Sequence, residues 1–363
     1  MVFGGAGRVG SFAVEYLART PGIEKIWIAD INDASGHCLA LNSSIGAAFD
    51  DSFPDIQFIK ANALDQDGLT RTLISTMPDI ILNASTTYSS YLYLRILSEK
   101  LREHGLESRC PGHMIAKDLL PLYWLMKSLK GAGLSSSVVN VCFPDIAHPV
   151  LAKLGLCPVV GAGEVALLAQ ALRRILSTTI RIPMSKIEVV LIANHALLVN
   201  RPETVPYYAR IQVEEDDVTE KFDLNRRITE AQQLMFKVPE WFSSMTASHA
   251  VRLVRAILHD THETLLAPGA DGMAGCLPTR VNSAGATVEL PQELSTARVE
   301  AMFSEGMKID GIERIEDDGT IVFSEPALQI LRKILCIDRK VLRISELKEM
   351  NDELLRFYEA NKG

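Results

Sequence analysis

The stretch Val2-Phe3-Gly4-Gly5-Ala6-Gly7-Arg8-Val9-Gly10 decides the fold of this 363-residue chain. It has the spacing Gly-x-Gly-x-x-Gly and lies between an apolar pair and a helical pattern that begins at Ser11. In this spacing the first glycine permits a tight turn, the second lets a pyrophosphate approach the backbone, and the third lets the helix pack closely on the strand. The helix N-terminus then offers N–H groups and a positive dipole end to phosphates. We therefore predict a dinucleotide-binding loop formed by Gly5, Gly7, Arg8, Val9 and Gly10, in which Arg8 either reaches a phosphate or is simply solvated.

An acidic residue ends the second predicted strand. Asp30 follows the apolar run 26–29 and lies twenty residues after Gly10. A carboxylate at this place can accept hydrogen bonds from the adenosine ribose hydroxyls, and it repels a 2'-phosphate. The sequence therefore predicts NAD as the cofactor, bound beside Asp30 and Ile31. The alternative is that Asp30 is an ordinary turn residue at the end of a strand.

The first part of the chain alternates short apolar runs with amphipathic stretches. Helical patterns cover Ser11 to Arg19 and Leu119 to Leu129, and the predicted strands are Val2-Phe3, Lys25 to Ala29, Ile56 to Ile59, Asp79 to Leu82 and Ser137 to Cys142. Repeated strand-helix-strand units with nearly continuous apolar strands are typical of a parallel sheet with helices on both faces. We therefore predict an α/β fold with a doubly wound parallel sheet of the Rossmann type over residues 1–155.

The alternation weakens after Gly155, and residues 156–363 are predicted to form a second, α+β domain that binds the substrate. Predicted helices cover Glu164 to Ser177, Val218 to Met235 and Ala247 to Leu258, with a strand over Ile187 to Ala193. Two hairpins are expected, over Cys276 to Leu290 and over Ile312 to Phe323. The Lys- and Glu-rich tail from Ser345 is most simply a solvated C-terminal helix.

Composition excludes several classes of function. Hydrophobic residues make up 47% and charged residues 23%, as in globular proteins, and the net charge of −8 comes without a basic block for nucleic acid. No apolar run is long enough to span a bilayer, and the first residues do not resemble a secretory signal. The six cysteines show no CxxC spacing, so neither disulfides nor a metal site is expected. We expect a cytoplasmic protein that acts on a small molecule and binds neither nucleic acid nor membrane.

Several segments, in order, resemble the lactate/malate dehydrogenase superfamily. These segments are the strand end and helix from Val138 through Phe143-Pro144-Asp145-Ile146, the stretch Val160-Gly161-Ala162-Gly163, the strand before His195, the helix from Thr246, and the hairpin from Leu277 to Gly285. The resemblance implies hydride transfer between NAD and a carbonyl or alcohol carbon, with His195 exchanging the proton. It also implies a homo-oligomer, a dimer or a tetramer, and further cofactor contacts from Asn83, Ala84 and Cys142.

The sequence departs from this family where the family binds its substrate. The positions of the aspartate that orients the histidine and of an arginine that clamps the carboxylate fall near Leu167 and Gln170. The arginine of the family's mobile loop is replaced by Ala116 or Lys117, and the asparagine before the proline by Phe143. An ordinary 2-hydroxy acid site is therefore not expected.

Other residues are candidates for the missing roles. Lys117 is the best remaining cation for an anionic substrate, or else a solvated lysine at a helix start. Glu164 either replaces the lost carboxylate or favours the N-terminus of its helix. By position alone, Asn194, Thr246, Ser248 and Arg201 are candidates for substrate contact. His113 and His148 have no spaced metal partner.

Two other functions stay open. The first half, in Gly5 to Gly10 and in Pro78 to Ala84, is also similar to the nucleotide-binding domain of saccharopine dehydrogenase. That resemblance implies a dehydrogenase acting on a carbon–nitrogen bond, which would explain the lost carboxylate clamp. If His195 is structural, the chain is instead a catalytically silent nucleotide-binding protein.

Overall fold

A computed structural model describes residues 1–105, 110–237 and 239–362, with the backbone alone for residues 239–241. The first sheet is parallel, in the order β3-β2-β1-β4-β5-β6. Its strands are β1 (Val2–Phe3), β2 (Lys25–Asp30), β3 (Asp55–Lys60), β4 (Ile80–Asn83), β5 (Ser137–Asn140) and β6 (Val160–Gly161). The order reverses between β1 and β4, which opens a crevice at the carboxyl ends of these two strands. The predicted doubly wound sheet is confirmed.

Helices of the first half lie between these strands in sequence. They are α1 (Arg8–Ala18), α2 (Asp33–Ala48), α3 (Gln66–Thr76), α4 (Ser90–Glu103), α5 (Ala116–Ala132) and α6 (Pro144–Lys153). Side chains fix where two of them begin, because Asn32 accepts a hydrogen bond from the Ser35 N–H and Asp65 accepts one from the Gly68 N–H. Helix α1 starts three residues before the predicted Ser11, directly after the glycine loop.

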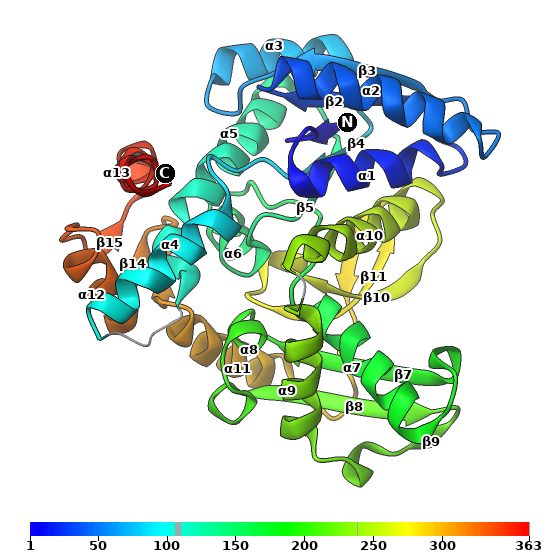
Figure 1. Cartoon of the computed structure of the whole chain (residues 1–363), viewed down its shortest axis with the longest axis vertical. Helices are drawn as coiled ribbons and strands as arrows, with labels where there is room; N and C mark the ends of the chain where they lie inside the picture. Colours follow the sequence, from blue (N-terminus) through cyan, green and yellow to red (C-terminus); the bar gives the residue numbers. More distant parts are fainter. Residues whose placement is uncertain (106–109, 238, 363) are drawn as a thin grey trace.

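The second sheet is antiparallel and confirms the α+β second half. Its strands are β7 (Ile187–Ala193), β8 (Tyr207–Val213), β9 (Asp216–Asp217), β10 (Glu263–Pro268), β11 (Cys276–Asn282) and β12 (Gly285–Val288). The accompanying helices are α7 (Val165–Ile180), α8 (Ala196–Val199), α9 (Leu224–Met235), α10 (Pro239–Leu258) and α11 (Thr296–Ile309). Helix α10 packs against α1, so the two halves share a hydrophobic core (Figure 1).

Two predicted helix starts in this half are wrong. Helix α10 begins at Pro239 and not at Ala247. The helix predicted from Val218 begins only at Leu224, because Thr219–Lys221 forms a short 3-10 turn. The Asp223 side chain accepts a hydrogen bond from the Arg226 N–H and so caps the helix at that point.

The C-terminal segment returns to the first domain. It contains the small sheet of β13 (Ile312–Ile315), β14 (Ile321–Phe323) and β15 (Val341–Leu342), with α12 (Glu325–Lys333) and α13 (Leu347–Asn361). Helix α13 packs against α5 and α4, and it buries Met350 and Leu354 (Figure 1). The predicted C-terminal helix is confirmed, but the prediction that it is solvated is wrong, because one face of this charged helix completes the core around α5.

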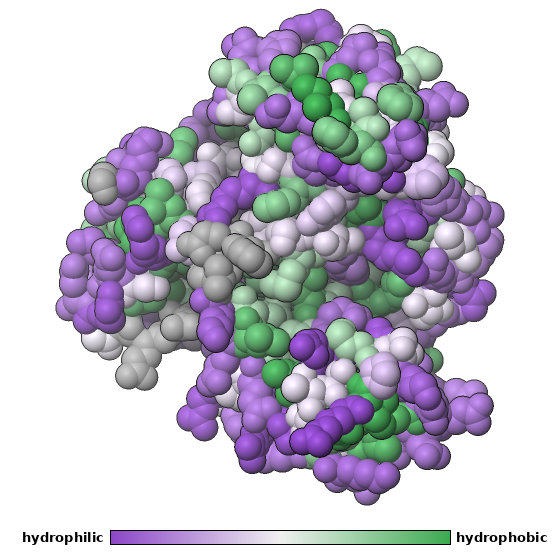
Figure 2. Space-filling view, turned by 45° about the vertical axis from the view of Figure 1, so that its right-hand side comes forward, coloured by the Kyte–Doolittle hydropathy of each residue, from purple (hydrophilic) through white to green (hydrophobic). Residues whose placement is uncertain are grey.

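The space-filling view shows a hollow between the first domain, at the top, and the second, at the bottom (Figure 2). Weakly polar and hydrophobic residues predominate in that hollow, whereas hydrophilic residues predominate on most of the outer surface. Among the described residues, no helix is both long and apolar enough to cross a bilayer.

Candidate functional site

The glycine loop connects β1 to α1 and leaves no room for larger side chains. Gly4 has a φ of +75°, and a Cβ there would lie 2.6 Å from the Ala84 carbonyl oxygen. A Cβ at Gly10 would lie 2.3 Å from the Gly4 carbonyl oxygen, whereas a Cβ at Gly7 would approach nothing closer than 3.1 Å. Helix α1 has no capping side chain and no acidic residue in its first turn. Its first N–H groups, which have no intrahelical partner, therefore fit a phosphate.

Asp30 lies beside this loop at the end of β2. Its carboxylate accepts hydrogen bonds from the Ala6 N–H at 3.0 Å and from the Asn32 N–H at 2.9 Å. These two bonds hold the carboxylate at the mouth of the loop, and each oxygen keeps a further lone pair for a ligand hydroxyl. Ile31 is exposed next to it. The Arg8 guanidinium lies over the Tyr91 ring at 5.3 Å from its centroid, and Val9 is half-buried.

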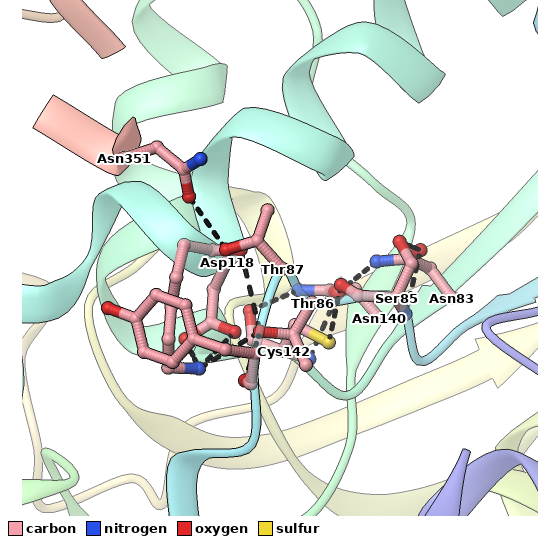
Figure 3. Close-up of polar contacts among 10 residues, drawn as sticks. Asn83, Ser85, Thr86, Thr87, Asp118, Asn140, Cys142 and Asn351 are labelled. Carbon is pink, nitrogen blue, oxygen red and sulfur yellow. Dashed lines mark hydrogen bonds and ion pairs between the residues drawn. The ribbon is translucent and has the colours of Figure 1, made fainter. Parts of the chain in front are cut away.

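The carboxyl ends of β4 and β5 bring three further candidates to the same edge of the first sheet, namely Asn83, Ala84 and Cys142. The Asn83 side-chain amide donates to Asn140 Oδ1 at 2.9 Å, which ties the end of β4 to the end of β5. The Cys142 thiol donates to the Ser85 carbonyl oxygen at 3.3 Å (Figure 3). Burial raises the pKa of Cys142 well above its usual range, so this thiol is not a nucleophile at neutral pH.

Lys117 lies in a closed polar group beside these strands. Its ammonium donates to both carboxylate oxygens of Asp118, at 2.6 and 2.7 Å, and to the Thr86 hydroxyl at 3.1 Å. The Lys117 side chain is completely buried. The neighbouring Thr87 hydroxyl donates to Asn351 Oδ1 of α13 at 2.6 Å (Figure 3). The solvated interpretation of Lys117 is therefore wrong, and its three donors are already used inside the protein.

His195 follows β7 and meets a carboxylate that the sequence analysis did not select. Its Nδ1 lies 2.9 Å from Asp310 Oδ2, just after α11, and Asp310 is completely buried. The His195 backbone N–H donates to Asp145 Oδ2 at 2.5 Å. The Phe143 ring packs edge-on against the imidazole, with centroids 4.9 Å apart. The imidazole is thus held in one orientation with Nε2 on its free side.

Glu164 faces that free side. Its Oε2 lies 3.9 Å from His195 Nε2, and the side chains of His195 and Glu164 are 13% and 10% exposed. Glu164 precedes α7 with φ 61° and ψ −134°, a backbone conformation that L residues rarely adopt. Phe143 also has a positive φ, of 42°. Such strain, typically about 1–3 kcal/mol for each residue, is concentrated at functional sites.

Burial and mutual repulsion set the protonation of this group. Burial raises the pKa of Glu164 to about 7, although the His195 charge acts in the opposite direction. Burial alone would lower the pKa of His195, but Asp310 and Glu164 outweigh it and raise that pKa to about 10. Burial, together with the Glu164 charge, raises the pKa of Asp145 well above its usual range. At neutral pH His195 is therefore an imidazolium.

The substrate candidates predicted by position differ in their surroundings. The Asn194 amide is buried and used twice, donating to the Ala274 carbonyl at 2.7 Å and accepting from the Ala196 N–H at 3.0 Å. Thr246 lies within 3.3 Å of where a Cβ on Gly163 would be, next to Glu164. Ser248 is exposed, and its hydroxyl donates to the Ser244 carbonyl. Of the three, Thr246 lies beside Gly163, the residue that precedes Glu164.

The remaining candidates are structural or exposed. Burial lowers the pKa of His113 and of His148 to about 4, and each ring is hydrogen-bonded to a backbone carbonyl. The Arg201 side chain is 83% exposed and pairs with Glu203. His249, which sequence reasoning missed, accepts a hydrogen bond from the Gly163 N–H at 2.9 Å and so fixes the backbone just before Glu164.

Sequence reasoning also missed Asp310 and Asp145. Asp310 lies 115 positions after His195, and no spacing signal links the two. Asp145 stands in the segment Phe143-Pro144-Asp145-Ile146, which was noted only for its resemblance. The only sequence signal for Asp145 was that it is an acidic residue in the first turn of the helix that follows β5.

Comparisons with known proteins agree with this arrangement at the level of the fold. The sequence matches no protein family and no curated protein. Among solved structures, the lactate dehydrogenase MGS-M5 from a Medee basin deep-sea metagenome library has a TM-score of 0.61 at 15% identity, over 85% of this chain and 95% of that chain. Malate dehydrogenase from Picrophilus torridus has a TM-score of 0.62 at 14% identity, over 99% and 98% of the two chains.

A lactate dehydrogenase from Cryptosporidium parvum, solved with lactic acid and nicotinamide adenine dinucleotide, has a TM-score of 0.60 at 12% identity, over 85% of this chain and 94% of that chain. The chain therefore has the fold of the lactate and malate dehydrogenases, as its sequence predicts. Within that fold its sequence is divergent, because it is only 12–15% identical to these three proteins.

Proposed function

We propose that this protein is an NAD-dependent oxidoreductase that transfers a hydride to or from a small substrate, with His195 as the acid/base residue. The observation that carries the proposal is the His195–Asp310 pair, oriented toward Glu164 and adjoining the nucleotide-binding edge through Phe143. The carbon that reacts carries an exchangeable proton on its oxygen or nitrogen. When bound, the dinucleotide supplies or accepts the hydride.

The chain's own residues would hold the dinucleotide and move the proton. The glycine loop and the start of α1 fit the pyrophosphate, and Asp30 would accept hydrogen bonds from the adenosine ribose. Asp310 accepts from Nδ1 and leaves the Nε2 proton of His195 for the substrate. An imidazolium at neutral pH is a proton donor, so the reductive direction is favoured there.

Oxidation of NADH tests the proposal. The protein is incubated with NADH and a panel of ketones, 2-oxo acids and imines, and the nicotinamide absorbance is followed. We expect at least one compound to be reduced. Retained NADH binding without turnover of any member would leave a nucleotide-binding protein and would refute the oxidoreductase.

The cofactor preference is tested separately. Because Asp30 would meet the 2'-phosphate as a like charge, NADH should bind at least roughly tenfold more tightly than NADPH. Titration of both cofactors, followed by nicotinamide fluorescence, measures this ratio, and Asp30→Ser should reduce it. Equal binding of the two cofactors by the unmodified protein would contradict the assignment.

We also propose a homo-oligomer. Helix α2 and the turn after it expose Leu41, Ile45, Phe49 and Phe53, and Phe49 is 88% exposed. Hydrophobic side chains are visible at the surface of the first domain (Figure 2), and an apolar patch of this kind favours association. Light scattering during gel filtration would detect a dimer or a tetramer. The cytoplasmic location stays a prediction of the sequence.

A further inference from the structure

The acid/base group holds more carboxyl groups than cations. Asp145, Glu164 and Asp310 surround the single imidazole of His195. The nearby ammonium of Lys117 is taken by Asp118 and Thr86. One oxygen of each of the three carboxyl groups has no hydrogen-bond partner among the described residues. A buried carboxylate oxygen without a partner is costly, so these atoms call for a positive or proton-donating ligand.

Glu164 has the most exposed side chain of the three carboxyl residues, because Asp145 and Asp310 are completely buried. Its Oε2 is itself buried and is one of the unpartnered atoms, and one-tenth of the side chain is exposed. The same oxygen points toward His195 Nε2, the atom from which a proton would pass to the substrate. His249 and the positive φ of Gly163 fix the backbone that presents it. A substrate that accepts the proton of His195 therefore also meets the Glu164 carboxyl.

Charge decides which substrates this site accepts. A substrate carboxylate beside Glu164 would meet a like charge. The positive charge of His195 is already paired with Asp310, and neither Leu167 nor Gln170 offers a further cation to offset the repulsion. A positively charged nitrogen would instead form a charge-assisted hydrogen bond with Glu164. Among the described residues, no group of three or more His, Cys, Asp or Glu side chains is arranged to hold a metal ion. An organic cation is therefore the ligand that fits.

We propose that the substrate carries an alkylammonium or iminium nitrogen that pairs with Glu164, beside the atom that His195 protonates. This inference rests on the proposed hydride transfer and narrows its substrate class. Asp310 holds Nδ1 of the imidazole and Asp145 holds the His195 backbone N–H, so Glu164 is the carboxyl group that contacts the nitrogen. The nitrogen lies either on the reacting carbon or on the carbon next to it, and the recognition chemistry is the same in both cases.

For both positions of the nitrogen, the atoms and electrons balance when the substrate is reduced by NADH. In a ketone with a neighbouring ammonium group, the carbonyl carbon takes the hydride from NADH while the carbonyl oxygen takes the Nε2 proton of His195. The products are an amino alcohol, NAD and a neutral imidazole. In an iminium, the carbon takes the hydride, the C=N double bond becomes a single bond, and the resulting amine nitrogen takes the proton from His195 to become an ammonium.

A matched set of three-carbon ketones tests the charge preference. Aminoacetone, hydroxyacetone and pyruvate carry an ammonium, a neutral hydroxyl and a carboxylate on the same framework. We expect kcat/KM for NADH oxidation to fall in that order, with aminoacetone at least roughly tenfold above pyruvate. Acetone mixed with methylamine, which forms an imine, places the nitrogen on the reacting carbon. Its turnover relative to aminoacetone tells the two positions apart.

Calorimetry provides a readout that does not depend on turnover. Aminoacetone is titrated into the NAD-bound protein near pH 7 in buffers of different ionisation enthalpy. Because the pKa of Glu164 is about 7, pairing with an ammonium group should release part of one proton into the buffer. Glu164→Gln should weaken aminoacetone binding roughly ten- to hundredfold, abolish the proton release and leave NAD binding unchanged. Glu188→Gln, on the exposed face of β7, is the matched control and should behave as the unmodified protein.

The two proposals can fail separately. If aminoacetone binds with proton release but no compound is reduced, the cation site stands and the oxidoreductase proposal fails. If compounds are reduced but pyruvate is preferred to aminoacetone, the cation site is overturned and the oxidoreductase stands. Equal aminoacetone binding by Glu164→Gln and the unmodified protein would also overturn the site, because the carboxyl cluster would then hold protons only.

Discussion

Two buried groups of ionisable side chains adjoin Cys142 and Phe143, and they differ in whether their polar atoms are satisfied. In the group around Lys117, the ammonium is bonded to Asp118 and Thr86, and Thr87 is bonded to Asn351. In the group around His195, three carboxyl groups each keep an oxygen without a partner. Charges from both groups influence the pKa of Cys142, so the two groups lie close together.

This difference distinguishes the Lys117 group, a structural ion pair, from the His195 group, a candidate ligand site. A buried ammonium and carboxylate that satisfy each other have nothing left to offer a ligand, whereas an unpartnered oxygen on a partly exposed side chain such as Glu164 does. Lys117 was selected from the sequence as a substrate cation, but its surroundings make it part of the scaffold. Substitutions in each group test this difference.

The largest effect is expected at His195. His195→Gln should lower the rate of the hydride-transfer step by roughly two to four orders of magnitude, because it removes the positioned proton donor. NADH affinity should stay nearly unchanged, since the glycine loop lies in the other domain. Single-turnover kinetics measures the step, and NADH binding confirms that the variant is folded. Near-normal hydride transfer in a folded variant would place the site elsewhere.

The next effect concerns folding rather than chemistry. Lys117→Met should reduce the free energy of unfolding by about 3–5 kcal/mol, because it leaves Asp118 buried without its partner. Combining it with Asp118→Asn should recover part of the loss, as a double-mutant cycle in urea would show. The exposed pair Lys186 and Glu214 is the control, and Lys186→Met should have little effect. A Lys117→Met variant that is as stable and active as the unmodified protein would contradict the structural role of the Lys117 group.

A smaller effect is expected in the pH dependence of stability. The pKa of Glu164 is raised from 4.5 to about 7 on folding, so the folded state holds this proton more tightly. The resulting contribution to stability is fully present below pH 4.5 and is lost as the pH rises through 7. His195, whose pKa is raised from 6.5 to about 10, adds a loss of the same sign at higher pH.

Glu164→Gln removes the first of these contributions. Between pH 4.5 and 7, the free energy of unfolding of the unmodified protein should fall by on the order of 2–3 kcal/mol relative to this variant. Urea unfolding at intervals across that range measures the difference, with Glu188→Gln as the control. Parallel curves for the two proteins would mean that Glu164 titrates normally.

The smallest effect is expected at the contact between α13 and the Lys117 group. Thr87→Val removes the hydroxyl that donates to Asn351 and leaves the buried Asn351 oxygen without this donor. The free energy of unfolding should fall by about 1–2 kcal/mol. Thr178→Val, on the exposed end of α7, should change it less. Thermal unfolding distinguishes the two variants.

The first sheet could be predicted because its signals are local. The glycine spacing from Gly5 to Gly10, the acidic residue Asp30 at a strand end, and continuous apolar strands all report on neighbouring residues, and the strand order confirms them. The tail from Ser345 could not be predicted in the same way. Its apolar residues Met350 and Leu354 form a stripe on a highly charged helix, and only packing against α5 shows that the stripe is buried.

The site was predictable only in part. His195 and Glu164 were selected separately, and the structure brings them together. Asp310 could not be found, because it reaches His195 through the packing of α11 beside β7. Lys117 was interpreted either as a substrate-binding cation or as a solvated lysine, and its complete burial excludes the second. A single sequence does not show which side chains are buried. Charged residues are almost never fully buried unless they are paired, so the solvated interpretation was the natural one.

The packing of α13 against α4 and α5 has a consequence for synthesis. Chains are made from the N-terminus, and early domains usually fold while later ones are still being added. Here the core of the first domain is completed only by α13, because Leu354 and Tyr358 belong to the same core as Leu119 and Tyr93. Until α13 emerges from the ribosome, part of that core stays open to solvent. A stop codon before Leu347 would therefore damage the domain farthest from it in the sequence.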